Sequence, residues 1–177
     1  MLLLPILAAC SGAADLDEPP VELGNFSLKH NVVVAPNVQK GPLSRDASKE
    51  DLIASMTLAI DERFGRYEGA KDYHFGISVE GYVLAAPGVP LVLSPKSILI
   101  IQITVWDDAA GKKLNEEPHV ITVLETFGTG SIVGSGFTLT PEEQLRQLTQ
   151  NAAKAVERYL LEQKREQGWF EEVPVDS

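Results

Sequence analysis

Two stretches of this sequence carry apolar residues at helical spacing, each on a single stripe, and this feature constrains the fold most. The first begins at Ser48, whose side chain is placed to cap a helix with Asp51 three residues on, and Gly69 is expected to end it. The second begins with Thr140, Pro141 and Glu143 and is expected to end at Gly168. The stripes are Leu52, Met56, Ile60 and Phe64, and Leu145, Leu148, Ala152, Ala155, Val156, Tyr159 and Leu160. A helix with one apolar stripe buries one side only, so both helices should cover the same layer.

That layer is predicted to be a β-sheet. Residues 29–35 read as a strand ended by Pro36. Residues 72–85 alternate apolar and polar side chains, which is typical of a half-buried strand. Residues 98–106 are apolar on both faces at their start and should form a central strand, followed by a turn and a last strand over 119–127.

The element order is therefore β-α-β-β-β-α, an α+β fold. The first helix joins the first two strands, which should be parallel, and the short later turns make the others antiparallel. We expect a two-layer domain over 27–170: a four-stranded mixed sheet with both helices packed on one face. The other sheet face is then open or covered by a partner.

The N-terminus indicates where the protein resides. Leu7-Ala8-Ala9-Cys10 resembles the lipobox of bacterial lipoproteins: an apolar residue, two small residues and a cysteine. The resemblance implies a signal peptide over 1–9, diacylglycerol on Cys10 and a cell-envelope location. Ser11 after the cysteine points to the outer membrane, facing the periplasm. No basic residue precedes Leu2, and a start codon further upstream would explain this.

The resemblance extends to the regions around the domain. Residues 10–26 are small, acidic and proline-containing, as expected of a flexible tether, and residues 171–177 form an acidic tail. The element order is similar to that of penicillin-binding-protein activators and of auxiliary lipoproteins of ABC-type transporters. The block GSGFTLTPEEQLRQLTQNAAKAVERYL also resembles an uncharacterised alphaproteobacterial lipoprotein family, which implies no activity.

Composition excludes several classes of partner. The chain of 177 residues has 25 acidic and 15 basic residues, a net charge of −10. This balance argues against binding to nucleic acid or electrostatic attachment to an anionic bilayer. With one cysteine, neither an intramolecular disulfide nor a cysteine-based metal site can form.

No catalytic constellation is visible in the sequence. His30, His74 and His119 lack the spacing of metal ligands, and Asp107-Asp108 reads as a hairpin turn. The glycine-rich stretch 128–136 is not followed by the Lys-Ser/Thr of a phosphate-binding loop. We therefore expect no enzyme, no cofactor and no metal.

Two features suit binding better. The apolar loop residues Val89, Leu91 and Leu93 could contact a protein partner or fold back over the core. Trp169 and Phe170 could anchor a partner or cap the core. The leading hypothesis is a lipid-anchored envelope module that binds a protein partner or assists assembly. The alternative is a lipoprotein that carries a small hydrophobic ligand, such as a lipid, between helices and sheet.

Overall fold

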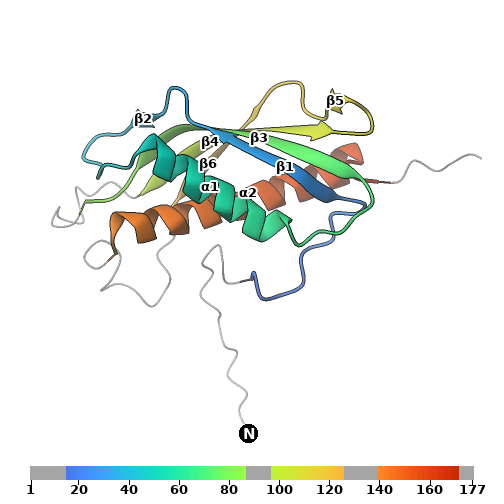
Figure 1. Ribbon diagram of the computed structural model, residues 1–177, viewed down its shortest axis with the longest axis horizontal. Helices are drawn as coiled ribbons and strands as arrows, with labels where there is room; N and C mark the ends of the chain where they lie inside the picture. The colour runs from blue at the N-terminus through green and yellow to red at the C-terminus, as the bar shows by residue number, and fades with distance from the viewer. Residues whose placement is uncertain (1–14, 87–96, 126–138, 172–177) are drawn as a thin grey trace, which may run out of the picture.

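The computed structural model describes residues 15–86, 97–125 and 139–171, which form an α+β domain of two layers (Figure 1). The elements follow in the order β1 (Ser27–Val34), β2 (Gln39–Lys40), α1 (Lys49–Phe64), β3 (Asp72–Val83), β4 (Ile98–Asp107), β5 (Lys112–Lys113), β6 (His119–Leu124) and α2 (Pro141–Gln167). The predicted fold class is confirmed.

The four longer strands pair as the element order predicts. β1 is parallel to β3, with Val33 opposite Ile77, and β3 is antiparallel to β4, with Ile77 opposite Ile103. β4 also pairs with β6, so it is a central strand as expected, and Ile101 lies opposite Ile121. The alternating residues of β3 and β4 therefore present one continuous apolar face.

Two strands were not predicted, because each is only two residues long. β2 pairs with β3 beyond a bulge between Val79 and Gly81, in line with β1 along the same edge of the sheet. β5 pairs with the end of β4, where Trp106 faces Lys113. Both lengthen an edge of the sheet and leave its central pairings unchanged.

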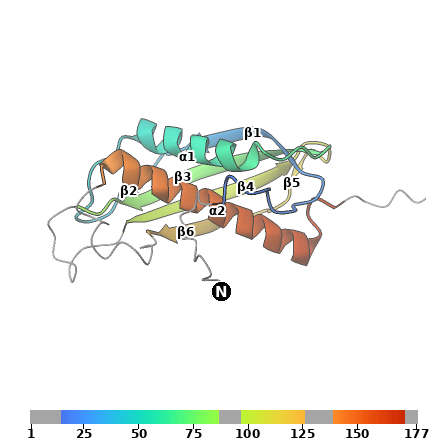
Figure 2. The same ribbon diagram turned by 90° about the horizontal axis from the view of Figure 1, so that it is seen from below.

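Both helices lie on one face of the sheet, as Figure 2 shows from the helical side. The Ser48 side chain accepts a hydrogen bond from the Asp51 amide at the start of α1. Thr140 and Glu143 form a reciprocal capping box at the start of α2, and Gly168 ends that helix in the left-handed region with φ 67°. Between the helices, the Ser55 and Thr149 hydroxyls lie 2.9 Å apart.

The core lies between the helices and the sheet. Its side chains come from the predicted stripes and from the alternating positions of the strands, and include Met56, Ile60, Phe64, Phe75, Ile77, Leu99, Ile101, Ile103, Val156 and Leu160. Burying each large apolar side chain contributes about 1.5–3 kcal/mol, so this interface holds the two layers together.

The end of α1 differs from the expectation. Gly65 caps the helix through a hydrogen bond to the Asp61 carbonyl, whereas Gly69 was expected to do so. Gly69 instead lies against the backbone of Phe26, and its amide donates to the Phe26 carbonyl at 2.9 Å. A Cβ at Gly69 would lie 2.2 Å from the Phe26 nitrogen. The glycine is thus explained by a close approach of two chain segments.

The expected tether over residues 10–26 differs from the structure in its described part. Leu23 and Phe26 are fully buried, and the Phe26 ring packs against Phe64, Tyr73 and Phe75. The core therefore begins before residue 27. The acidic and proline-containing composition of this segment led to the prediction of a tether, although its apolar residues Leu23 and Phe26 fill the end of the core.

Candidate functional site

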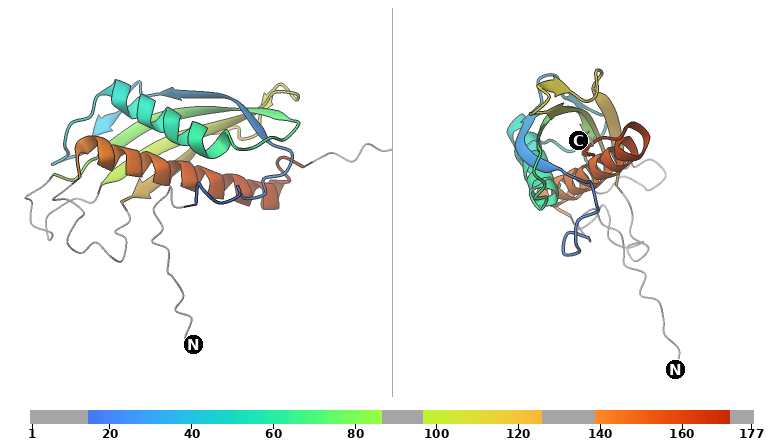
Figure 3. Two further views of the ribbon diagram at one scale, coloured as in Figure 1. Left: turned by 60° about the horizontal axis from the view of Figure 1, so that its bottom comes forward. Right: turned by 90° about the vertical axis from the view of Figure 1, so that its right-hand side faces the viewer.

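The face of the sheet opposite the helices is uncovered by any described element, and it is the first candidate site. Figure 3 shows it end-on, above the helical layer in the right-hand view. Val32 of β1 is 58 % exposed, and Val120 and Leu124 of β6 are each 53 % exposed. Val34 and Trp106 are exposed on the same face. Exposed apolar side chains gathered on one face are typical of an interaction surface.

A shallow hollow of about 230 Å³ lies in the middle of this face. It is lined by Val32, Val34, Gly76, Ile77, Ser78, Gln102, Thr104 and Pro118. The register explains it, because Gly76 stands between Val32 on β1 and Thr104 on β4 and has no side chain to fill the space. The surface therefore has apolar borders on its two outer strands and a recessed centre, where the polar side chains of Ser78, Gln102 and Thr104 lie beside apolar ones.

Two histidines close one end of the same face. The rings of His30 and His74 stack with centroids 4.9 Å apart, and His74 Nε2 lies 2.9 Å from Asp108 Oδ1. His74 Nδ1 is buried without a hydrogen-bond partner. The sequence did not reveal this pairing, because the β1–β3 register brings together residues 44 positions apart.

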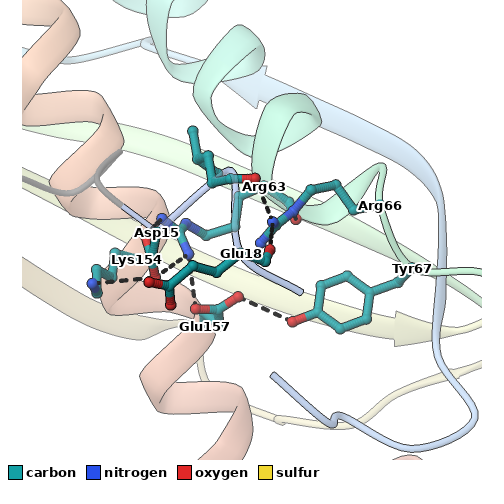
Figure 4. Close-up of polar contacts among 8 residues, drawn as sticks. Asp15, Glu18, Arg63, Arg66, Tyr67, Lys154 and Glu157 are labelled. Atoms are coloured by element: carbon teal, nitrogen blue, oxygen red, sulfur yellow. Dashed lines mark hydrogen bonds and ion pairs between the residues drawn. The ribbon is translucent and has the colours of Figure 1, made fainter. Parts of the chain in front are cut away.

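A cluster of charges on the helical side is the second candidate site (Figure 4). The Arg63 guanidinium, 1 % exposed, donates to Glu157 Oε2 at 2.9 Å and to Asp15 Oδ1 at 2.8 Å. Lys154 also contacts Asp15 at 3.2 Å, and the Tyr67 hydroxyl donates to Glu157 Oε1 at 3.0 Å. A buried charge is tolerated only when it is paired in this way.

The same cluster shifts the pKa of its members. The hydrogen bond from Arg63 lowers the pKa of the Asp15 carboxyl to about 2, against a partial opposing effect of burial. Burial, and then the charge of Glu157, raises the pKa of the Tyr67 hydroxyl. Asp15 and Arg63 are therefore charged throughout the physiological pH range. The cluster holds chain segments together through permanent ion pairs and does not exchange protons in that range.

Within the residues that the structure describes, no group of three or more His, Cys, Asp or Glu side chains is arranged to hold a metal ion. In the same part of the chain, every helix is too short or too polar to cross a membrane.

The structure places two of the predicted binding residues in the core. Trp169 is 9 % exposed and Phe170 is 3 % exposed, and the Phe170 ring contacts Phe26 and Tyr73. They cap the core, one of the two roles that the sequence left open, and the anchoring role is corrected. Phe170 adopts a positive φ of 65°, a conformation that costs on the order of 1–3 kcal/mol and that its burial offsets.

The other predicted site residues lie outside the described part of the chain. They are Cys10, Val89, Leu91 and Leu93. The loops 87–95 and 128–136, under which a ligand cavity would lie, fall entirely outside it as well.

Sequence reasoning missed the apolar borders of the open face and the charged cluster. The sequence predicts a strand over the valines of β1 but does not show which of them face the solvent. Side chains two residues apart lie on the same face of a strand, so Val32 and Val34 share the open face. Arg63 directly precedes Phe64, a residue of the first apolar stripe, and Glu157 follows Val156, a residue of the second. A charged residue directly beside a buried apolar stripe, on each of the two helices, was the sequence signal that could have predicted a buried ion pair.

These features define a class of protein, an α+β two-layer domain with one open sheet face. No protein-family model matches the sequence, and no curated protein matches it. The fold is similar to that of a proposed lipoprotein from Caulobacter crescentus CB15, with a TM-score of 0.40, 10% identity and coverage of 82% of this chain and 93% of that one. A Xanthomonas campestris protein of the DUF330 family gives a TM-score of 0.43, 11% identity and coverage of 85% and 93%. A minor lipoprotein of Acinetobacter baumannii gives a TM-score of 0.30, 16% identity and coverage of 78% of this chain and 93% of that one. The likeness concerns the arrangement of strands and helices alone.

Proposed function

We propose that this protein is a lipoprotein of the cell envelope, anchored through Cys10 and facing the periplasm, that binds a protein partner with the open face of its sheet. It performs no chemistry of its own. The single observation that supports binding is the set of exposed apolar side chains on that face, with Val32 on one outer strand and Val120 and Leu124 on the other. The lipobox resemblance of Leu7-Ala8-Ala9-Cys10 supports the anchor.

The polar side chains at the centre of the face indicate which chemical groups the partner surface carries. Ser78, Gln102 and Thr104 line the recessed middle, whereas the borders are aliphatic. A complementary protein surface has two rows of apolar side chains with hydrogen-bonding groups between them. Such a mixed surface is typical of interfaces whose partners also exist apart.

The anchor is tested by metabolic labelling with a fatty-acid probe. The wild-type chain is expected to take up the label and Cys10→Ser to lose it. Label that persists in Cys10→Ser would contradict the anchor.

Binding is tested with a photo-crosslinking amino acid placed at Val120 or at Leu58. The two positions are equally exposed, at 53 %, but Leu58 lies on α1 on the other side of the molecule. A discrete adduct with an envelope protein is expected from Val120 and not from Leu58, and Val32→Asp should abolish it. Adducts from Leu58 alone, or from neither position, would overturn the binding proposal.

A further inference from the structure

We infer that residues 15–23 are a strap docked on the helical layer, and that the strap turns α1 and α2 toward the membrane and the open sheet face away from it. The inference rests on the proposed lipid at Cys10. It adds the surface that meets the bilayer, which the proposed function leaves open.

The strap is held along its length by side chains of the helices and of the turn after α1. Asp15 pairs with Arg63 of α1 and Lys154 of α2. Arg66 Nη1 donates to the carbonyl oxygens of Leu16 and Glu18, both at 2.8 Å.

The contacts continue to the start of the domain. Lys164 of α2 donates to the Glu22 carbonyl at 3.0 Å, and Leu23 is 1 % exposed in the core. The strap is therefore fastened at Asp15, along its middle and at its end.

The strap lies on the outer side of the helices, opposite the sheet. In Figure 1 its blue trace runs below α1 and α2 while the strands lie above them, and both views of Figure 3 agree. The contacts of Asp15 with one helix on each side place it over the groove between α1 and α2.

The chain length to the anchor then limits the orientation. Asp15 follows Cys10 by five residues, which span about 18 Å at most when fully extended. The part of the helical layer that contacts Asp15 must lie within that distance of Cys10, whereas the open sheet face lies farther from Asp15 by one helix diameter, roughly 10 Å, and the thickness of the sheet. If residues 10–26 were instead a free tether, the chain between the lipid and the domain would be much longer, and it would not favour one face of the domain over the other.

The test uses the full chain coupled to phospholipid vesicles through the Cys10 thiol, the only cysteine of the chain. A donor dye is attached through a clickable amino acid at either Gln147 or Thr122, and the acceptor is a dye-labelled lipid. Gln147 is an exposed residue of α2, and Thr122 is an exposed residue of the open face. Energy transfer is expected to be stronger from Gln147 than from Thr122.

The strap itself is tested with a charge reversal. Asp15→Arg places a third cation beside Arg63 and Lys154, and the difference in transfer between the two positions should decrease, because the strap is then held only by Arg66, Lys164 and the buried Leu23. Asp17→Arg changes the charge equally on an exposed residue of the same segment and should keep the difference. If Asp15→Arg fails to fold, a Gly-Ser insertion of about ten residues between Ala14 and Asp15 can be used instead. It lengthens the chain between the lipid and the strap and leaves the contacts of the strap with the helices in place. It should also remove the difference in transfer.

Equal transfer from both positions in the wild type would overturn the inference. So would an undiminished difference in the folded Asp15→Arg variant or in the insertion variant. Because the lipid is coupled chemically, these outcomes do not depend on acylation in cells. Failure of the proposed anchor would appear only as missing fatty-acid label on Cys10.

Discussion

Arg63 and Glu157, 94 residues apart in the chain, meet at 2.9 Å with side chains 1 % and 4 % exposed. The pair joins the last turn of α1 to the middle of α2, and its position in the apolar layer makes the Glu157 charge dependent on Arg63, which is itself paired with Asp15 as well. Removing one partner from a buried pair is more harmful than removing both, because it leaves an uncompensated charge.

We therefore expect Arg63→Met to lower the free energy of unfolding by about 3–5 kcal/mol. Glu157→Met should be less harmful, because Arg63 keeps its ion pair with Asp15, and the double variant should be more stable than Arg63→Met. Urea denaturation of the four proteins in a double-mutant cycle measures this coupling. Additive losses in the double variant would show that the two charges are not interdependent.

The Asp15 carboxyl gives the strap a pH dependence. Its pKa is lowered from 3.8 to about 2 in the folded protein by the Arg63 hydrogen bond, so the pair stabilises the fold fully above about pH 4 and loses this effect as the pH falls to 2. Asp15→Asn should cost about 1 kcal/mol at pH 7 and nothing below pH 2, where the wild-type carboxyl is itself protonated. Parallel denaturation curves at both pH values check this. An unchanged gap at low pH would contradict it.

Two glycines with opposite surroundings provide a matched pair of variants. Gly69→Ala forces a methyl group into the Phe26 backbone and should destabilise the domain by about 1–3 kcal/mol. Gly76→Ala meets only Thr104 at 4.0 Å, so it should be neutral or slightly stabilising, since glycine is unfavourable within a strand. Thermal melts of both variants test the close approach at Gly69. Similar melting of the two would show that the Phe26 segment can move away.

The second helix offers a test of its cap and of its buried face. Thr140→Ala removes the acceptor for the Glu143 amide and should cost about 1 kcal/mol. Val156→Asp places a charge at a fully buried position and should be far more harmful. Circular dichroism during urea denaturation compares the two variants. If Val156→Asp unfolds at the same urea concentration as the wild type, the packing of α2 is wrong.

The sequence was most informative where the signals are local. The capping box at Thr140 and the left-handed Gly168 are determined within a few residues, and α2 begins and ends where they predict. The alternation of β3 likewise predicted its buried face. What escaped prediction depends on distant contacts. Phe26 and Phe170 are 144 residues apart, yet their rings meet at 5.1 Å, so no local pattern distinguished a core cap from a surface anchor.

The docking of residues 15–18 also determines how the domain bears tension. A pull on the chain from the N-terminal side reaches the Asp15–Arg63 ion pair and the carbonyl oxygens held by Arg66 before it reaches Ser27, where β1 begins. Among the described strands β1 pairs only with β3, and a force that peels its end away from β3 would break their hydrogen bonds one after another. The strap passes the load to the end of α1 instead, and thereby protects β1 from mechanical unzipping.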